Sequence, residues 1–510
     1  MRTLNSAKNL ASSLGLSILM VVMGFVTRKI FVDNVGVEYL GLNGLLQNIL
    51  GLMTLLEGGF ATSVVYNMYK PLAEDDRPRI LALLQLYRKV YRYIAGGVFL
   101  CGLAIYPFIG YLIKDADGLS YVSVVYFIFL FNSLVQYFTA YKWSIINASQ
   151  KNYKLTVINL VYQVGLSLGK MAILYYTKNY ILYLVVEALF GVGYNIAIVR
   201  KANQLFPYIV TKVKYAVEPA VKKNIIANMK ALFLHSLGGY FMHSTDNIVI
   251  SAFIGVGIIG LWSNYTLLTG TVSTFITQTL NSFSESVGHL IASESKQKVY
   301  EVFKTIFFVN FIVVSIPVVL MWATLSPFIS WWLGSEYELS PVMVGIVLFN
   351  FYINGMRSSA MTFKTKSGIF VKDRWTPLLQ GLINLGLSLL LVQRFGLSGV
   401  LAATGISILS IGFWQWPLLC YKYAFNQPLR KYFAHYGAYT LVGATALFLS
   451  MWVCSLVSID NKLLDVVWRG VSSLAVVCVV YWTAFRRTEP YRELMVYVKS
   501  IIGQLRPVKS

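Results

Sequence analysis

The sequence predicts an all-α polytopic membrane protein with about 14 transmembrane helices. About 14 apolar stretches of helix length follow one another through nearly all of the 510 residues, and a helix that crosses a bilayer needs ~20 such residues. Only 13% of the residues are charged, whereas soluble domains carry ~25%. The stretches do not alternate between apolar and polar residues, so helices are favoured over a membrane β-barrel.

The predicted spans follow from these stretches. In chain order they cover residues 10–32, 42–66, 93–113, 119–141, 154–177, 180–199, 231–253, 260–283, 305–328, 341–360, 376–393, 397–421, 436–457 and 466–485. Between the second and third spans, residues 78–93 form a basic amphipathic segment, which is typical of a helix lying in the membrane interface.

The basic residues predict the orientation. With the N-terminus placed inside, 34 of the 43 lysines and arginines fall in inside gaps or the tails, four fall in outside gaps and five fall within spans. Cytoplasmic loops carry such an excess, so both termini are expected in the cytoplasm. The net charge of +22 has the same origin, and nucleic-acid binding is not expected.

An internal repeat predicts two pseudo-symmetric six-helix lobes. Residues 36–42 read GVEYLGL and residues 255–261 read GVGIIGL, each at the turn between the first two spans of its half. Repeats of this kind are typical of transporters. The predicted domains are an N-terminal lobe, a basic cytoplasmic linker, a C-terminal lobe, two extra helices, and a basic amphipathic cytoplasmic tail, over residues 1–200, 201–230, 231–425, 426–485 and 486–510.

Charged residues within the spans are the candidates for function, because such a group normally faces a cavity or a partner. They are Arg28, Lys29, Glu57, Lys170, Glu187, Asp246, Glu285 and Arg357. Arg28 is expected in a cavity. Lys29 and Lys170 line the cavity or reach the outer interface, and Arg357 is expected to reach the inner one.

Asp246 and Glu57 are the acidic candidates for ion coupling. Asp246 occupies the repeat position that matches Arg28, so it either pairs with Arg28 or binds a proton or cation. His243 lies one turn from Asp246 and is a candidate for a proton relay. The eighth span is rich in hydroxyl and amide side chains, Asn264 among them, which predicts a wet cavity or a polar helix contact.

No cofactor or metal site is expected. The motif Gly255-x-Gly257-x-x-Gly260 fits a dinucleotide-binding pattern, but it lies at a turn between two spans and lacks the strand that such a site requires. The four cysteines lie within or at the ends of apolar stretches and form no C-x-x-C pair.

Three segments, TRKIFVDNVGVEYLGLNGLLQNIL (27–50), LLEGGFATSVVYNMYKPLAEDD (55–76) and STDNIVISAFIGVGIIGLWSNYTLL (244–268), together with the twelve-plus-two layout, resemble the Wzx-type lipid-linked oligosaccharide flippases. These O-antigen and capsule exporters belong to the MOP exporter superfamily, with the lipid II flippases and MATE transporters. The resemblance implies two lobes around a cavity. Arg28, Lys29 and Lys170 would hold the phosphates of an undecaprenyl-linked sugar there.

The expected function is therefore export of a lipid-linked oligosaccharide from the cytoplasmic to the outer leaflet. The protein is expected to act as a monomer among membrane lipids, with proton or sodium coupling and glycan-assembly partner proteins left open. A MATE-like small-molecule/cation antiporter remains an alternative. A membrane polysaccharide polymerase or ligase is a weaker one, because the outside gaps are too short to hold an acceptor site.

Overall fold

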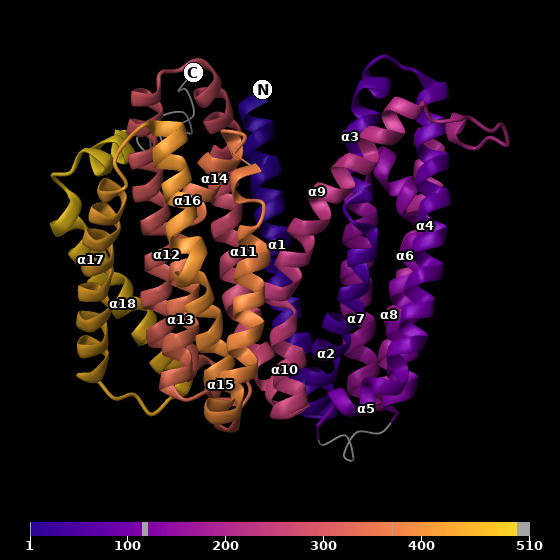
Figure 1. The fold of residues 1–510 in the computed structure, drawn as a ribbon. Helices are drawn as coiled ribbons and strands as arrows, with labels where there is room; N and C mark the ends of the chain where they lie inside the picture. Colours follow the sequence, from indigo (N-terminus) through magenta and orange to yellow (C-terminus); the bar gives the residue numbers. More distant parts are fainter. Residues whose placement is uncertain (1, 115–120, 370, 497–510) are drawn as a thin grey trace. The chain divides into compact units, whose positions relative to one another are not determined.

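The computed structural model describes residues 2–114, 121–369 and 371–496 (Figure 1). Side chains of residues 2–18, 230, 231, 234, 235, 243, 281–286, 289, 292 and 371 also lie outside the description. Over the described residues the chain is helical without strands, so the predicted fold class is confirmed. The chain forms two compact units, Met1–Ser263 (unit 1) and Asn264–Ser510 (unit 2).

All 14 predicted stretches are mainly helical where the structure describes them, with short turns within several of them. Among the described residues, nine helices are long and apolar enough to cross a membrane: Val37–Glu57, Arg77–Leu112, Val122–Ala148, Asn152–Thr177, Tyr180–Leu205, Lys296–Trp332, Thr376–Phe425, Arg430–Ser455 and Lys462–Phe485. One of them, Thr376–Phe425, contains two predicted spans. The backbone leaves helical geometry at Gly396 (φ 54°, ψ −134°), between the predicted ends at residues 393 and 397.

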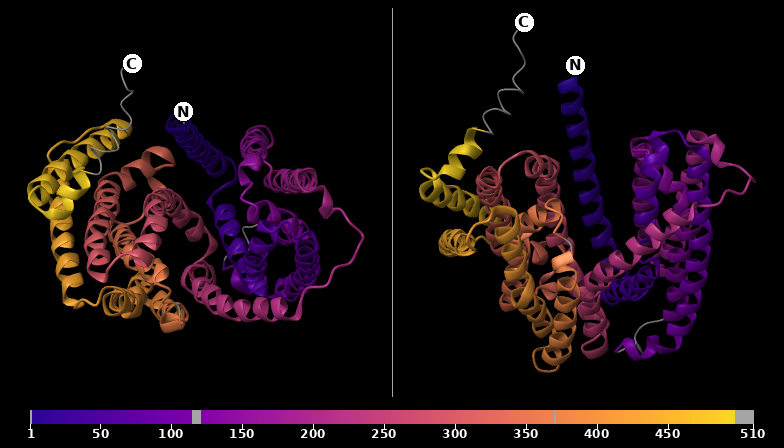
Figure 2. Two further views of the ribbon diagram at one scale, coloured as in Figure 1. Left: turned by 90° about the horizontal axis from the view of Figure 1, so that it is seen from above. Right: turned by 45° about the horizontal axis from the view of Figure 1, so that its top comes forward.

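Unit 1 is a helical bundle in which α6 packs against α4 and α8, and α7 packs against α1 and α8. Figure 2 shows α9 as a long oblique helix leading to α10. The helices are α1 (Arg2–Val35), α2 (Val37–Met53), α3 (Phe60–Ala73), α4 (Arg77–Ile105), α5 (Ile109–Leu112), α6 (Val122–Ala148), α7 (Thr156–Thr177), α8 (Tyr180–Leu205), α9 (Pro219–His243), α10 (Thr245–Phe253) and the first turns of α11 (Val256–Ser293), with short 3₁₀ segments at Thr54–Glu57, Tyr106–Phe108, Asn152–Leu155 and Pro207–Ile209.

The predicted second span is broken, not continuous. After the 3₁₀ turn Thr54–Glu57, Gly58 and Gly59 adopt positive φ angles of 52° and 72°, which glycine tolerates best. A Cβ atom at Gly59 would lie 2.5 Å from the Cβ of Leu232. Helix α9 therefore packs directly on the break, and the glycine pair both ends the helix and admits its neighbour.

The prediction of an interfacial helix at residues 78–93 is wrong. These residues form the first half of α4, and their apolar face is buried inside unit 1, with Ile80, Leu83 and Tyr87 each at most 4% exposed. The amphipathic pattern indicated a buried face correctly. It could not distinguish burial in lipid headgroups from burial against other helices, because both environments select the same periodicity.

The linker predicted at residues 201–230 is shorter in the structure. Helix α8 continues to Leu205 and α9 begins at Pro219, so the connecting segment covers residues 206–218. Arg79 holds its end through an ion pair of 2.8 Å to Glu218. The compact units divide within α11, and the predicted lobe boundaries remain a prediction.

The two copies of the repeat contact each other reciprocally within unit 1. A Cβ atom at Gly41 would lie 1.8 Å from the carbonyl oxygen of Val256, and one at Gly260 would lie 1.9 Å from that of Val37. Gly41 and Gly260 are equivalent repeat positions, as are Val37 and Val256. The backbones of α2 and α11 thus touch at a two-fold related joint that only glycine permits.

Unit 2 is built around α12, which packs against α13, α17 and α18 (Figure 1). The buried ring cluster on α12 includes Phe303, Phe307 and Phe311. The helices of the unit are the rest of α11, α12 (Lys296–Trp332), α13 (Pro341–Met356), α14 (Ser358–Lys366), α15 (Thr376–Ser407), α16 (Phe413–Leu419), α17 (Arg430–Ser455) and α18 (Lys462–Phe485), with π-helical segments at Ile408–Gly412 and Cys420–Phe425 and 3₁₀ segments at Ser335–Tyr337 and Val371–Asp373.

Arg357 does not reach the inner interface, contrary to expectation. It is 3% exposed in unit 2 and donates hydrogen bonds to the amide oxygens of Asn354 and Gln380, at 2.8 and 3.4 Å. Its guanidinium also lies 4.4 Å from the ring centroid of Trp416. Two amides and an indole face satisfy this cation inside the unit, which removes the reason for it to extend to the headgroups.

Candidate functional site

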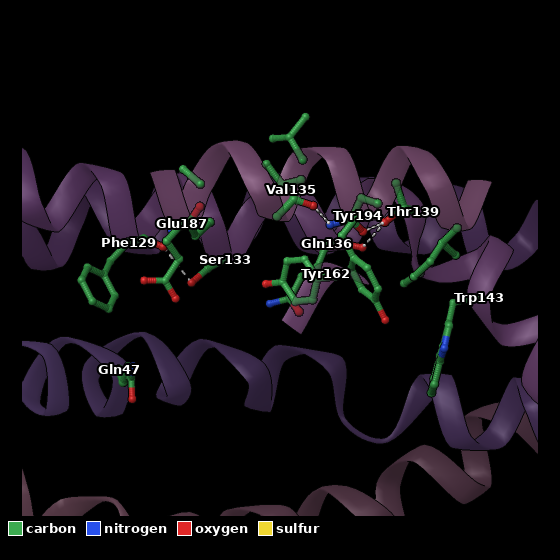
Figure 3. A pocket seen from close by; sticks show the side chains of 17 residues that line it. Gln47, Phe129, Ser133, Val135, Gln136, Thr139, Trp143, Tyr162, Glu187 and Tyr194 are labelled. Atoms are coloured by element: carbon green, nitrogen blue, oxygen red, sulfur yellow. Dashed lines mark hydrogen bonds between the residues drawn. The ribbon is translucent and has the colours of Figure 1, made fainter. Parts of the chain in front are cut away.

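A polar pocket of about 530 Å³ lies within unit 1, between α2, α6, α7 and α8. Amide, hydroxyl and carboxylate groups line it together with aromatic rings, namely Gln47, Asn132, Ser133, Gln136, Thr139, Glu187 and Asn195 with Phe129, Trp143, Tyr162 and Tyr194. In Figure 3, Gln47 lies on a helix across the pocket from Glu187 and Ser133. Within a membrane bundle, such a lining provides sites for a polar ligand.

Several lining groups hold one another in place. Thr139 donates a hydrogen bond to the amide oxygen of Asn195 and so links α6 to α8. The rings of Tyr162 and Tyr194 stack with centroids 4.4 Å apart, and the Tyr194 hydroxyl donates to Asn159 at 2.9 Å. The pocket therefore combines a fixed aromatic wall with amide and hydroxyl groups, which is a lining that suits the faces and hydroxyls of sugars.

Lys170 and Glu187 form an ion pair at the wall of this pocket. The Nζ of Lys170 on α7 lies 2.9 Å from a carboxylate oxygen of Glu187 on α8. The Lys170 side chain is 14% exposed and that of Glu187 is 35% exposed. The ammonium also lies 4.6 Å from the ring centroid of Tyr183. The acid faces the pocket, and the cation lies behind it.

Arg28 is also a neighbour of Tyr183. It is half-buried on α1 and donates a hydrogen bond of 2.8 Å to the hydroxyl of Ser263, in the first turns of α11. Its guanidinium interacts electrostatically with Tyr183. Phe31, one turn further along α1, contacts the same tyrosine edge-on at 5.2 Å. Tyr183 thus connects Arg28 to the Lys170–Glu187 pair.

Arg28, Lys170 and Glu187 lie equally many residues from the nearer ends of their helices. Arg28 and Lys170 each lie seven residues before the ends of α1 and α7, and Glu187 lies seven residues after the start of α8. Seven residues correspond to about 10 Å along a helix. The structure therefore brings Arg28 and Lys170 together around Tyr183 in unit 1, with an acid between Lys170 and the pocket.

The other predicted residues lie elsewhere. The side chain of Lys29 is more exposed, at 44%, and forms an ion pair of 3.1 Å with Asp33. Asp246 is half-buried in the first turn of α10, where the positive end of the helix dipole favours an acid. Asn264 is fully buried in α11. The side chain of His243 lies outside the described residues.

Glu57 accepts a hydrogen bond of 2.7 Å from the hydroxyl of Tyr91, which is 3% exposed. Tyr91 packs against the rings of Tyr87 and Tyr137, with centroids 4.4 and 5.6 Å away. The carboxylate thus ties the break after α2 to α4 through a buried aromatic cluster. That arrangement satisfies the acid structurally, and its part in ion coupling stays a prediction.

Sequence reasoning missed most of the pocket. Asn132, Ser133, Gln136 and Thr139 recur at helical spacing on one face of the predicted fourth span, and this polar stripe was a usable signal. Glu187 was noticed but received no role. Among the described residues, no group of three or more histidine, cysteine, aspartate or glutamate side chains could hold a metal ion.

Unit 2 contains a second concave site, an apolar groove of about 190 Å³ between α12, α13 and α17. Trp322, Leu348, Phe349 and Leu447 are among its lining residues, and the hydroxyls of Ser315, Tyr352 and Thr440 lie at its margin. The Tyr352 and Thr440 hydroxyls are 2.8 Å apart and satisfy each other. The groove therefore presents an almost entirely hydrocarbon surface.

No protein-family model matches the sequence, and no curated protein matches it in sequence. Solved structures do match the fold. A lipid II flippase MurJ in an inward closed conformation superposes with a TM-score of 0.63 at 14% identity, covering 92% of this chain and 98% of that one.

Multidrug transporters share the fold as well. An inward-facing MATE family transporter of the MOP superfamily gives a TM-score of 0.53 at 14% identity, over 78% of this chain and 94% of that one. A mutant of the Vibrio cholerae MATE transporter VcmN gives 0.53 at 11% identity, over 83% and 99%. The chain thus has the fold of MOP exporters, which agrees with the coarser part of the sequence resemblance.

Proposed function

We propose that this protein is a flippase that moves a polyprenyl-diphosphate-linked oligosaccharide from the cytoplasmic to the outer leaflet by alternating access. The observation that carries the proposal is the polar, aromatic pocket of unit 1 beside half-buried cations. Its amides and hydroxyls offer hydrogen bonds to sugar hydroxyls, and the Tyr162–Tyr194 stack offers a face to a sugar ring. Sugars are the large polar ligands that such a lining fits.

The cations supply the second part of the substrate site. Arg28 and Lys170 both interact with Tyr183 beside the pocket, and charge-assisted donors of this kind suit phosphate oxygens. Lys29, half-exposed on α1, is a further candidate for an early contact with the headgroup. In a low-dielectric bundle these positive groups stabilise an anion far more than in water.

The groove of unit 2, taken by itself, suits a hydrocarbon chain. Its lining is hydrocarbon with little polar surface, which fits a prenyl chain and not a sugar. A prenyl chain already lies in hydrocarbon in the bilayer, so the groove would hold it by shape and van der Waals packing and not by the hydrophobic effect. The likeness of the fold to a lipid II flippase supports a lipid-linked substrate.

A small-cation antiporter of MATE type is the second candidate. The observation that favours it is Glu187, an acid that lines the pocket among aromatic rings, because such a lining also attracts a cation. The paired Lys170 weakens this alternative, since it neutralises Glu187 in the empty protein.

Arg28→Ala tests the flippase proposal in cells that depend on this protein for surface polysaccharide. We expect delivery to fall at least ~10-fold at unchanged membrane abundance, since a hydrogen bond to a charged group contributes ~1.5–3 kcal/mol. Arg28→Lys should be intermediate, because lysine keeps the charge but loses the planar fork. Arg394→Ala removes an exposed arginine from unit 2 and serves as the control. Wild-type delivery by Arg28→Ala would contradict the proposal.

Transport is proposed to be coupled to a proton or sodium gradient through Asp246 or Glu57. The protein is proposed to act in the bacterial inner membrane, with both termini in the cytoplasm, as a monomer beside glycan-assembly partners.

Asp246→Asn keeps the shape of the side chain and removes its charge. We expect it to make transport in vesicles independent of the ion gradient while substrate binding persists. Unchanged gradient dependence would exclude Asp246.

A further inference from the structure

The positions of Lys170 and Glu187 relative to the pocket determine which of the two side chains an entering ligand meets first. Glu187 lines the pocket, while Lys170 lies behind it against the ring of Tyr183. The two charged atoms are 2.9 Å apart. A ligand that approaches the ammonium from the pocket therefore meets a carboxylate that is already bound and competes with it.

Lys170 is the cation that pairs with Glu187, at 2.9 Å. Glu187 also interacts electrostatically with the tyrosines Tyr162, Tyr180 and Tyr183. A displaced Glu187 would instead face the pocket, where sugar hydroxyls can donate hydrogen bonds to it. Displacement thus leaves neither charge unpaired when the ligand carries both an anion and a sugar.

We infer that Glu187 is a specificity-determining residue, which makes the site respond to a diphosphate headgroup and ignore the singly charged phosphodiesters of bulk phospholipids. The inference rests on the proposed function. When a phosphodiester replaces the Glu187 carboxylate at Lys170, one single negative charge replaces another, so the electrostatic free energy of the contact does not improve. A diphosphate brings a second charge and more acceptor oxygens, so it can displace Glu187.

This competition would address a problem that any lipid-headgroup site meets in a membrane. Anionic phospholipids surround the protein in large excess over a scarce carrier lipid, so an unpaired lysine would be occupied by them through mass action. Specificity is a difference of affinities, and a built-in competitor lowers affinity for the wrong ligand more than for the right one.

The experiment compares farnesyl diphosphate with methyl farnesyl phosphate, a singly charged phosphodiester, on the purified full-length protein, measured by titration calorimetry. We expect the wild type to prefer the diphosphate at least ~10-fold, and Glu187→Gln to bind the phosphodiester ~10-fold more tightly so that the preference falls below ~3-fold. Inorganic pyrophosphate should compete with farnesyl diphosphate on the wild type, because the headgroup is what Lys170 recognises. A failure to compete would overturn the inference.

Two further variants keep the test decisive. Asp465→Asn breaks a half-buried ion pair of 2.8 Å to Arg469 in unit 2 and should leave the preference unchanged. The double variant Lys170→Glu with Glu187→Lys keeps an ion pair but places the cation at the pocket, so it should also lose the preference for the diphosphate. It provides the test if Glu187→Gln does not fold.

The outcomes separate this inference from the proposed function. If the wild type binds neither prenyl phosphate, the flippase proposal itself fails. If the wild type prefers the diphosphate and both Glu187 variants keep that preference, the substrate class stands and the role of Glu187 is overturned.

Discussion

Replacing Gly41 or Gly260 with alanine is expected to destabilise the protein by about 3 kcal/mol or more, at the upper end of overpacking effects. The added Cβ atoms would lie 1.8 Å from the carbonyl oxygen of Val256 and 1.9 Å from that of Val37. Both obstacles are backbone atoms, so no rotamer change can relieve the clash. The two helices must move apart at the joint, which also disturbs any transport cycle that closes it.

Thermal unfolding of the purified protein measures this effect, and the chain offers matched controls. Gly24 and Gly239 also lie within helices, but a Cβ atom at either would meet nothing within 4 Å. Alanine there should be neutral or stabilise the helix by up to ~1 kcal/mol. The double variant at Gly41 and Gly260 should cost little more than one single variant, because one separation relieves both clashes. A wild-type melting temperature for Gly41→Ala would contradict the reciprocal joint.

The repeat illustrates what the sequence could and could not predict. Two similar heptads at corresponding turns indicated an internal repeat, and a positive φ at the first glycine of each, 102° at Gly36 and 141° at Gly255, confirms that the two turns are alike. The contact between Gly41 and Gly260 was beyond reach, because residues 219 positions apart meet only through the tertiary fold. Local patterns specify local geometry and leave the pairing of distant turns open.

The fold was predictable to the extent that hydrophobic length decides it. The apolar stretches are mainly helical, although the second is broken at Gly58 and Gly59, and the separation of the eleventh and twelfth spans coincides with the non-helical Gly396. The errors arose where two environments select the same residues. Residues 78–93 have an apolar helical face that could be buried either in lipid or against other helices, and the sequence does not distinguish the two. Arg357 donates hydrogen bonds to amide groups inside unit 2, whereas the sequence predicts a side chain that extends to the interface.

The site was predictable only in part for a related reason. Arg28 and Lys170 stood out because charges within spans are rare and normally functional. Their surroundings depend on which helices are neighbours, so the ion pair between Lys170 and Glu187, 17 residues apart on antiparallel helices, was not deduced. The polar lining of the pocket was visible as a stripe on the fourth span, but hydroxyls and amides are common enough in helices that a stripe alone names no ligand.

Breaking the buried ion pair of unit 2 is expected to cost about 3–5 kcal/mol of stability, because it leaves a charge without its partner in a low-dielectric interior. Lys364 and Asp373 are paired with their side chains only 5% and 1% exposed. The Lys364 ammonium also lies 5.2 Å from the ring centroid of Trp416, which cannot replace a full negative charge. Asp373→Ala should therefore lower the melting temperature sharply.

A double-mutant cycle distinguishes this pair from ordinary polar packing. Lys364→Met combined with Asp373→Ala removes both charges, so it should recover much of the loss caused by Asp373→Ala alone. The pair between Lys298 and Glu301 is the control, since its atoms are 3.7 Å apart and its side chains are 57% and 40% exposed. Glu301→Ala should cost at most about 1 kcal/mol. If Asp373→Ala costs no more than Glu301→Ala, or the double variant is the least stable of all, the uncompensated charge is not what destabilises unit 2.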